Sequence, residues 1–174
     1  PWVQRWSHLI PGGGAVLDVA CGHGRHMRWF AQRGHPVTGV DRSPEAIAAV
    51  QGLGEALVAD IENGPWPFPG RAFAGVVVTN YLWRPVLPAI LQSVATGGVL
   101  IYETFTAGNE TVGKPSRPDF LLAPGELLRA CASLRDCRLD ETCRLAGESL
   151  PDEAVLAVHG LALLVDEPSI RLHP

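Results

Sequence analysis

The sequence has few cysteines, little net charge and no long apolar run. No hydrophobic stretch approaches the roughly 20 residues that cross a bilayer, so we expect no membrane partner. The cysteines Cys21, Cys131, Cys137 and Cys143 form no CxxC pair and accompany no histidine cluster. We therefore expect structural thiols in a cytoplasmic protein, and no metal site. A formal net charge of −4 argues against a broad nucleic-acid-binding face, so nucleic acid is not an expected partner.

What the sequence does have is ample material for one core. The chain has 174 residues, of which 47% are hydrophobic. This length and composition predict a single domain over residues 1–174, without internal repeats.

Strand-like and helix-like segments alternate along the chain. Buried strands are predicted over 15–20, 37–40, 56–60, 73–79 and 99–104. Helices are predicted over 1–10, 25–33, from Ser43 onward, about 85–95, and from Pro124 onward. This alternation predicts βαβ units with right-handed crossovers, and hence a doubly wound α/β fold with a mostly parallel sheet. The stretches of about 136–145 and 154–165 have no helix between them and predict an antiparallel hairpin at one edge.

Acidic residues recur at the ends of the first three predicted strands. Asp18, Asp41 and Asp60 stand at corresponding places, and the carboxyl ends of parallel strands line one crevice where ligands bind. Gly22 and Gly24 allow a tight turn and a close approach of a ligand to the backbone. Asp41 follows the loop by about 20 residues, the distance at which such a residue meets a ribose. The alternative is a plain strand-to-helix turn in which Asp41 caps a helix.

The glycine loop does not fit the dinucleotide fingerprint G-x-G-x-x-G. Met27 stands where the third glycine would allow close helix–strand packing. The loop is also acidic, which favours a ligand with an ammonium and a sulfonium group over one with a pyrophosphate. Arg25 is expected to meet the carboxylate of such a ligand. A nicotinamide-dependent oxidoreductase is therefore disfavoured.

At this point several segments together carry a family resemblance. They are Val16-Leu17-Asp18-Val19-Ala20-Cys21-Gly22-His23-Gly24-Arg25-His26, Gly39-Val40-Asp41-Arg42-Ser43-Pro44, Ala59-Asp60-Ile61-Glu62, Val77 to Leu82 and Gly97 to Phe105. The chain resembles the class I S-adenosylmethionine-dependent methyltransferases, and more loosely the tellurite-resistance-like methyltransferases of bacteria. The resemblance implies a Rossmann-like, seven-stranded sheet in the order 3-2-1-4-5-7-6, with strand seven antiparallel. It also implies S-adenosylmethionine as cofactor and S-adenosylhomocysteine as product.

The resemblance assigns the first loop to the methionine part of the cofactor. Asp18 and Gly22 would hold that part, and Gly24 would allow its close approach. Ala20 stands where many relatives have glycine, which is a small departure. Cys21 is expected to be a small residue packed near the cofactor, since a nucleophilic thiol would need a lowered pKa.

The later strand ends are assigned to the rest of the cofactor. Asp41 would bind the ribose hydroxyls, and Arg42 would lie beside the adenine. Asp60 and Ile61 would flank the adenine ring. Three further residues would sit under the methionine and face the acceptor: Asn80, Tyr81 and Leu82.

Two segments are expected to form the acceptor pocket. One follows the fourth strand and offers Trp83 and Arg84, although Trp83 packed on a helix and a solvated Arg84 is an equal alternative. The other is a long polar loop, 105–122, which is either a lid or disordered. Its expected acceptor-binding residues are Asn109, Lys114 and Arg117. Tyr81 and Glu103 are the expected proton acceptors, whereas His23 and His26 are expected to be exposed at a helix start.

The leading functional hypothesis is methyl transfer to a small-molecule acceptor by a bacterial enzyme that is a monomer or homodimer. Methyl transfer from a sulfonium is an in-line displacement, in which alignment and the exclusion of water matter most. The alternatives are methylation of RNA or protein, and a protein that binds the cofactor without catalysis. The segment Asn80-Tyr81-Leu82-Trp83 differs from the Asn-Pro-Pro-Tyr pattern of enzymes that methylate amino groups of that kind.

Overall fold

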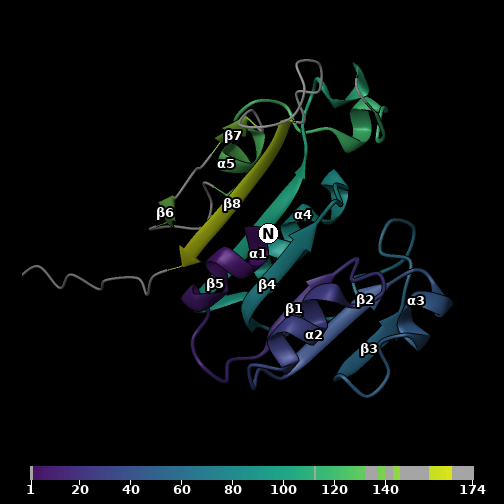
Figure 1. Ribbon diagram of the computed structural model, residues 1–174, viewed down its shortest axis with the longest axis vertical. Coiled ribbons are helices and arrows are strands. Elements are labelled where there is room, and N and C mark those ends of the chain that lie inside the picture. Colours follow the sequence, from purple (N-terminus) through teal and green to yellow (C-terminus); the bar gives the residue numbers. More distant parts are fainter. Residues whose placement is uncertain (1, 112, 132–136, 140–142, 146–156, 166–174) are drawn as a thin grey trace, which may run out of the picture.

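Eight strands, five short helices and four 3-10 turns make up the part of the chain that the structure describes. This computed structural model describes residues 2–111, 113–131, 137–139, 143–145 and 157–165 (Figure 1). The strands are β1 (Val16–Val19), β2 (Val37–Asp41), β3 (Glu55–Val58), β4 (Phe73–Thr79), β5 (Val94–Phe105), β6 (Cys137–Leu139), β7 (Cys143–Leu145) and β8 (Ala157–Val165). The helices are α1 (Trp2–Trp6), α2 (Arg25–Ala31), α3 (Pro44–Ala48), α4 (Leu87–Gln92) and α5 (Glu126–Cys131). The 3-10 turns are η1 (Ser7–Leu9), η2 (Arg84–Val86), η3 (Asn109–Thr111) and η4 (Pro118–Phe120).

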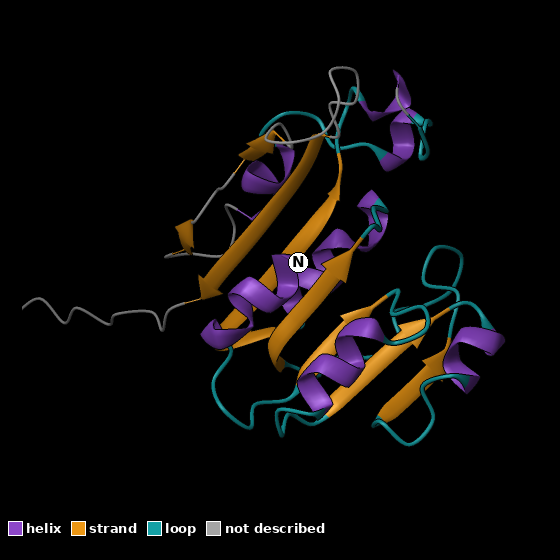
Figure 2. Ribbon diagram, in the orientation of Figure 1, coloured by secondary structure: helices purple, strands orange, loops and turns teal. Residues whose placement is uncertain are grey.

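The strands form one mixed sheet in the order β3-β2-β1-β4-β5-β8-β6 (Figure 2). The first five run parallel, and β8 pairs with β5 in the antiparallel sense. β6 and β7 both pair antiparallel with β8, so the predicted sixth strand is represented by two short ones. The predicted doubly wound α/β fold and its strand order are confirmed.

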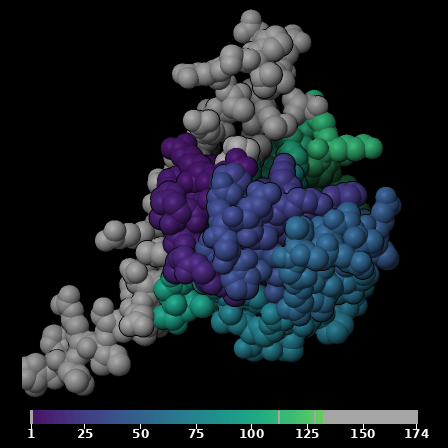
Figure 3. Space-filling model, turned by 60° about the horizontal axis from the view of Figure 1, so that its bottom comes forward, coloured from purple at the N-terminus to yellow at the C-terminus, as the bar shows by residue number. Residues whose placement is uncertain are grey.

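Helices cover both faces of the sheet. On one face, α1, α2 and α3 contribute Val3, Met27, Phe30 and Ile47 to a core with Val77 of β4. In a space-filling view the purple N-terminal segment lies against the blue residues that follow it (Figure 3). On the other face, side chains of α4 and α5 pack against alternate residues of β1, β4 and β5. Successive strand residues therefore point to opposite helix layers.

Two predicted helix ends are wrong. The fourth helix, expected to reach residue 95, ends at Gln92, and β5 begins at Val94, earlier than the predicted residue 99. Val94 pairs with Phe73 of β4 across an irregularity in the register, and Gly98 fits there because a Cβ would lie 3.0 Å from the backbone oxygen of Phe73. α2 ends at Ala31 rather than residue 33, and Gly34 follows with a positive φ of 81°.

Among the described residues, none of the helices has the length and apolar character to cross a membrane.

Candidate functional site

The neighbouring strands β1 and β4 both end in a left-handed residue. Ala20 has a φ of 54° and Asn80 a φ of 55°. Residues other than glycine rarely adopt this left-handed backbone conformation. Such backbone strain collects at functional sites, where the surrounding structure holds it in place. The left-handed conformation also explains why the relatives in the resemblance have glycine at the position of Ala20.

Asp41 ties the end of β2 to the glycine loop. Its Oδ2 accepts a hydrogen bond from the backbone N–H of Gly22 at 2.9 Å. Its Oδ1 accepts one from the N–H of Ser43, also at 2.9 Å. Ser43 in turn caps α3 by accepting from the Ala46 N–H, as its sequence position predicts. One hydrogen bond per oxygen leaves each carboxylate oxygen able to accept another.

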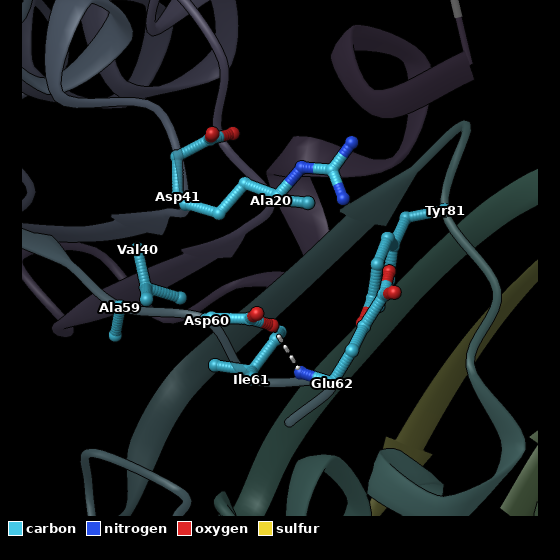
Figure 4. Close-up of a pocket in the computed structure, with 9 residues that line it drawn as sticks. Ala20, Val40, Asp41, Ala59, Asp60, Ile61, Glu62 and Tyr81 are labelled. Carbon is cyan, nitrogen blue, oxygen red and sulfur yellow. Dashed lines mark hydrogen bonds between the residues drawn. The ribbon is translucent and has the colours of Figure 1, made fainter. Parts of the chain in front are cut away.

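A pocket lies where β1, β2 and β3 end (Figure 4). Six of the predicted cofactor-binding residues line it, namely Ala20, Asp41, Arg42, Asp60, Ile61 and Tyr81. Sequence reasoning missed Val40, Ala59 and Glu62, each of which is next in sequence to a predicted residue. With three carboxylates and one guanidinium, the lining is acidic.

Asp60 organises the turn that follows β3. Its Oδ2 accepts from the Asn63 side-chain amide at 2.8 Å, and its Oδ1 from the Glu62 N–H at 3.0 Å. The Asn63 hydrogen bond is the main reason why the pKa of Asp60 lies below its ordinary value. The exposed Asp60 is therefore ionised at neutral pH and adds negative charge to the rim of the pocket.

Asp18 lies behind the glycine loop in a very different setting. It is only 2% exposed, and its Oδ2 has no hydrogen-bond partner among the described residues. Burial raises the pKa of Asp18 to about 7, and the nearby Asp41 adds to the rise. The Met27 backbone N–H and the Arg25 guanidinium act in the opposite direction. An orphaned carboxyl oxygen of this kind is a position where a cationic ligand group fits.

The two loop glycines have different structural roles. Gly22 has a φ of 51°, and a Cβ there would meet no atom within 4 Å, so the loop is open to a ligand at this point. At Gly24 a Cβ would lie 2.2 Å from Cγ1 of the buried Val50, so its role in this structure is packing. Gly39 on β2 makes room in the same way for the sulfur of Met27. Met27 therefore fits in the place of a third loop glycine because a neighbouring strand supplies the space.

Cys21 is buried and poorly suited to nucleophilic chemistry. Burial, together with the carboxylates of Asp18 and Asp41, raises the pKa of the Cys21 thiol to about 12. A thiol in that state is not ionised at neutral pH, which disfavours a nucleophilic role, and its packing beside the cofactor stays a prediction.

The expectation that both loop histidines are exposed is wrong for His26. His23 is exposed, but His26 is 5% exposed and packs under the start of α2. Burial lowers the pKa of His26 to about 4, so its Nε2 accepts a hydrogen bond from the exposed Arg25 side chain at 3.1 Å. Arg25 remains at the mouth of the loop, beside Glu103, whose pKa it helps to hold down.

The predicted proton acceptors differ in character. Tyr81 extends toward Glu62 at the pocket, and its hydroxyl has no partner among the described residues (Figure 4). Burial and the carboxylates of Glu62 and Asp60 raise the pKa of Tyr81, which disfavours it as a base. Burial also raises the pKa of the half-buried Glu103, and this makes a carboxylate more basic. Tyr102 points to the opposite face and donates to the Tyr81 carbonyl oxygen at 2.8 Å.

Three other predicted cofactor or acceptor residues lie beyond the pocket lining. Asn80 is exposed at the end of β4, and its N–H donates to the Glu103 carbonyl oxygen at 2.8 Å. Leu82 is 2% exposed and belongs to the core. The half-buried Trp83 has its ring 6.4 Å from that of Phe120, centroid to centroid.

Arg84 joins the end of β4 to the predicted acceptor loop. Its Nε and Nη2 donate to the two carboxylate oxygens of Glu126 at 2.6 and 2.9 Å. The same guanidinium donates to the carbonyl oxygens of Asp119 and Leu121. We name this set of contacts the Arg84 clamp. Arg84 is still exposed, at 41%, but its guanidinium is bound within the fold rather than left free for an acceptor.

The rest of the loop is structured. Asn109 is fully buried, and its side-chain amide donates to the Pro115 carbonyl oxygen at 2.9 Å. Lys114 and Arg117 are exposed, and Arg117 forms an ion pair with Asp119 at 2.8 Å. A bridge between Thr106 and Leu122 closes the base of the loop. The described part of this loop therefore has a defined structure, and its role as a lid stays a prediction.

Within the described residues, no group of three histidine, cysteine or carboxylate side chains is placed to hold a metal ion. The Cys137 and Cys143 side chains lie outside the described part of the chain.

Comparisons with known proteins agree with this arrangement. Residues 16–97 match the family model described as a methyltransferase domain. An uncharacterized methyltransferase from Synechocystis sp. is 35% identical over 98 residues, which are 51% of this chain and 42% of that protein. The chain thus spans less than half the length of this curated relative.

Solved structures share the fold. One is a TehB-like SAM-dependent methyltransferase from Corynebacterium glutamicum, with a TM-score of 0.66, 18% identity, and coverage of 94% of this chain and 86% of that one. Another is a SAM-dependent methyltransferase from Archaeoglobus fulgidus, with a TM-score of 0.70, 15% identity, and coverage of 93% and 90%. The residues matched by the family model include the glycine loop, Asp41, Asp60 and Tyr81, which are the parts that build the pocket. With this fold and this strand-end site, the chain is similar to the class I S-adenosylmethionine-dependent methyltransferases, and its residues 16–97 match a methyltransferase domain.

Proposed function

We propose that this chain binds S-adenosylmethionine and transfers its methyl group to a small-molecule acceptor by in-line displacement, leaving S-adenosylhomocysteine. The observation that carries the proposal is the acidic site at the ends of β1, β2 and β3, with an orphaned carboxyl oxygen on Asp18 behind it. Carboxylates suit a ligand that offers hydroxyl and ammonium donors. The same negative charges disfavour a pyrophosphate.

The residues of the site divide between the two ends of this cofactor. Apolar side chains of Val40, Ala59 and Ile61 offer a surface for the adenine ring, and Arg42 lies beside them. Asp41 has one free acceptor position on each oxygen for the ribose hydroxyls.

At the other end, the open Gly22 allows the methionine part to pass close to the backbone. Asp18 would receive its ammonium group, and the exposed Arg25 its carboxylate. These assignments follow the resemblance and fit the charges found at each position.

The bound cofactor supplies a methyl group on a sulfonium, which is already a good leaving group. The chain therefore has to align the acceptor and exclude water. Where the acceptor must lose a proton, Glu103 is the better of the two predicted bases. Burial raises the pKa of Glu103 and makes its carboxylate more basic, whereas the raised pKa of Tyr81 keeps its hydroxyl protonated at neutral pH.

A small acceptor fits the surroundings of the site better than a nucleic acid. The lining of the pocket carries more carboxylates than cations, and the net charge of the chain is −4. RNA binding depends on cations that replace the counterions of phosphates. The aromatic pair Trp83 and Phe120, with the Arg117 guanidinium 5.2 Å from the Phe120 ring, offers a surface for a flat or anionic molecule.

Titration calorimetry with S-adenosylhomocysteine tests the cofactor assignment. We expect binding at micromolar levels, and a loss of at least about tenfold in affinity for Asp41→Ala, which removes a charged acceptor from the ligand. Glu45→Ala, an exposed carboxylate on α3, is the matched control and should bind normally. Absence of binding by the wild-type chain would overturn the proposal.

The acceptor class is tested with radiolabelled S-adenosylmethionine and separated fractions of small molecules, RNA and protein. Label transferred to the small-molecule fraction supports the proposal. Transfer to RNA or protein alone contradicts the acceptor class and leaves the cofactor assignment intact.

A further inference from the structure

The carboxyl group of Asp18 is buried and only partly satisfied. Asp18 points to the sheet face covered by α2, because its neighbours Leu17 and Val19 belong to the core on the other face. It is 2% exposed, and its Oδ2 has no partner among the described residues. A charged carboxylate in such a place is costly unless a donor satisfies it. The free protein therefore favours the neutral acid.

The charged and titratable groups around Asp18 do not change this preference. On α2, Arg25 is exposed and directed at His26, which burial keeps neutral. Asp41 at the end of β2 repels a second negative charge, and the buried Cys21 remains a neutral thiol. On the other side, β4 has no charged residue. The nearest donor is the Met27 N–H, and burial outweighs it and raises the pKa of Asp18 to about 7.

We propose that cofactor binding is linked to a proton: the Asp18 carboxyl holds a proton in the free protein and releases it when the ammonium group of the cofactor binds. The O–H bond of the acid breaks, the proton goes to the solvent, and an ammonium N–H of the ligand donates to the freed oxygen. This inference rests on the proposed cofactor, whose ammonium group supplies the countercharge.

The direction of the pH dependence follows from linkage. Below pH 7 the free protein carries the extra proton, so a lower pH opposes binding. Above pH 7 the carboxyl of the free protein is already ionised and the affinity levels off. From a free-protein pKa of about 7, we expect binding to be roughly eightfold tighter at pH 7.5 than at pH 6. His26, near 4, and Cys21, near 12, titrate outside this window.

Calorimetry of S-adenosylhomocysteine binding in two buffers with different ionisation enthalpies counts the protons released. We expect about 0.9 proton released near pH 6 and about 0.2 near pH 7.5 for the wild-type chain. Asp18→Asn copies the shape of the neutral acid and should bind more weakly, with no proton released. His23→Gln is the matched control, since histidine is the residue that usually changes charge at this pH. It should keep the wild-type proton count.

The outcomes separate this inference from the proposed function. Binding without proton release, and with equal affinity at both pH values, overturns the linkage and leaves the cofactor assignment in place. Proton release that disappears in His23→Gln also overturns it, because the proton then comes from the histidine. If the chain binds no S-adenosylhomocysteine at any pH, the proposed function and the linkage both fail. If Asp18→Asn does not fold, the numbers of protons released by the wild-type chain and by His23→Gln still show whether binding is linked to a proton that does not come from the histidine.

Discussion

The polar groups at the ends of β1 to β3 differ in their hydrogen bonding from those at the ends of β4 and β5. At the ends of β1 to β3, Asp18 has an orphaned oxygen, Gly22 faces open space and Asp60 is exposed. At the ends of β4 and β5, Arg84 makes four hydrogen bonds and the Asn109 side-chain N–H holds its own loop, although the Tyr81 hydroxyl and Asn109 Oδ1 have no partner among the described residues. The first side leaves carboxylate oxygens open, whereas the second side uses its N–H donors within the fold.

This difference shows what residue type alone cannot. Arg84, which follows β4, and Asn109, in the long polar loop, both look like ligand-binding residues, but both form hydrogen bonds that stabilise that loop. Asp41 looks like a helix cap in the sequence, but each of its carboxylate oxygens has an acceptor position left over. Polar atoms whose hydrogen-bonding capacity is unsatisfied within the fold, more than polar residue types alone, indicate where a ligand binds.

Asp18→Asn should produce the largest effect, a gain in the stability of the free protein at neutral pH. The pKa of Asp18 is raised in the folded state to about 7, so ionisation between pH 4 and 7 favours the unfolded chain. The wild-type protein therefore loses stability as pH rises through this window, by about 4 kcal/mol for a pKa that rises from 3.8 to about 7 on folding. Denaturant unfolding near pH 7.5 and pH 4.5 measures the difference, which should shrink at the lower pH.

Asp60→Asn is the matched variant with the opposite sign. Its pKa is lowered in the folded state, so its ionised form favours folding and the stability it contributes is lost as pH falls. The variant should be less stable than the wild type at neutral pH. If Asp18→Asn is not stabilising there, the buried carboxyl is better satisfied than the structure indicates and the contrast between the two sides fails.

Gly24→Ala should produce the next largest effect, a loss of about 3 kcal/mol in the free energy of unfolding. The new methyl group would meet Val50, and the φ of 72° adds strain. Gly22→Ala is its partner, with a similar φ but open space, and should cost only about 1 kcal/mol. We expect the reverse order for S-adenosylhomocysteine affinity, with Gly22→Ala the weaker binder in calorimetry. Equal losses of affinity would mean that both glycines approach the ligand.

These glycines also show how far the sequence can be interpreted. A strand followed by a glycine loop predicts a turn, and Ser43 predicts the start of α3, because such signals lie within a few residues of one another. The acids at the ends of β1, β2 and β3 follow from the same local patterns, together with the rule that parallel strands share one carboxyl edge. Most of the pocket was predictable for this reason.

The remaining features depend on contacts between distant residues. The packing of Gly24 on Val50, the burial of His26 and the early start of β5 beside Phe73 have no local signal. The Arg84 clamp joins residues 42 positions apart. Glycines within strands, such as Gly39 and Gly98, were the one available hint, since they often mark a close approach of another group.

Arg84→Met should destabilise the chain by about 2 kcal/mol while leaving S-adenosylhomocysteine affinity within about twofold of the wild type. The change keeps the apolar stem but removes charge-assisted hydrogen bonds and leaves Glu126, which is 19% exposed, without its partner. Amide hydrogen exchange in residues 106–122 should become faster. Arg117→Met is the matched control. Its ion pair is far more exposed, at 71% and 58%, and should contribute less than about 0.5 kcal/mol. A large loss of cofactor affinity in Arg84→Met would show that the two sides are coupled.

Ala20→Gly and Asn80→Gly compare the two strained strand ends directly and should have the smallest effects. At Ala20 glycine relieves left-handed strain of about 1 kcal/mol, but part of that gain is lost because glycine makes the unfolded chain more flexible. A net gain of about 0.5 kcal/mol is expected. Asn80→Gly should change little, since asparagine tolerates the left-handed region. Paired denaturation curves measure both. A stabilised Asn80→Gly would mean that the β4 end is as strained as the β1 end, so that backbone strain does not distinguish the two sides.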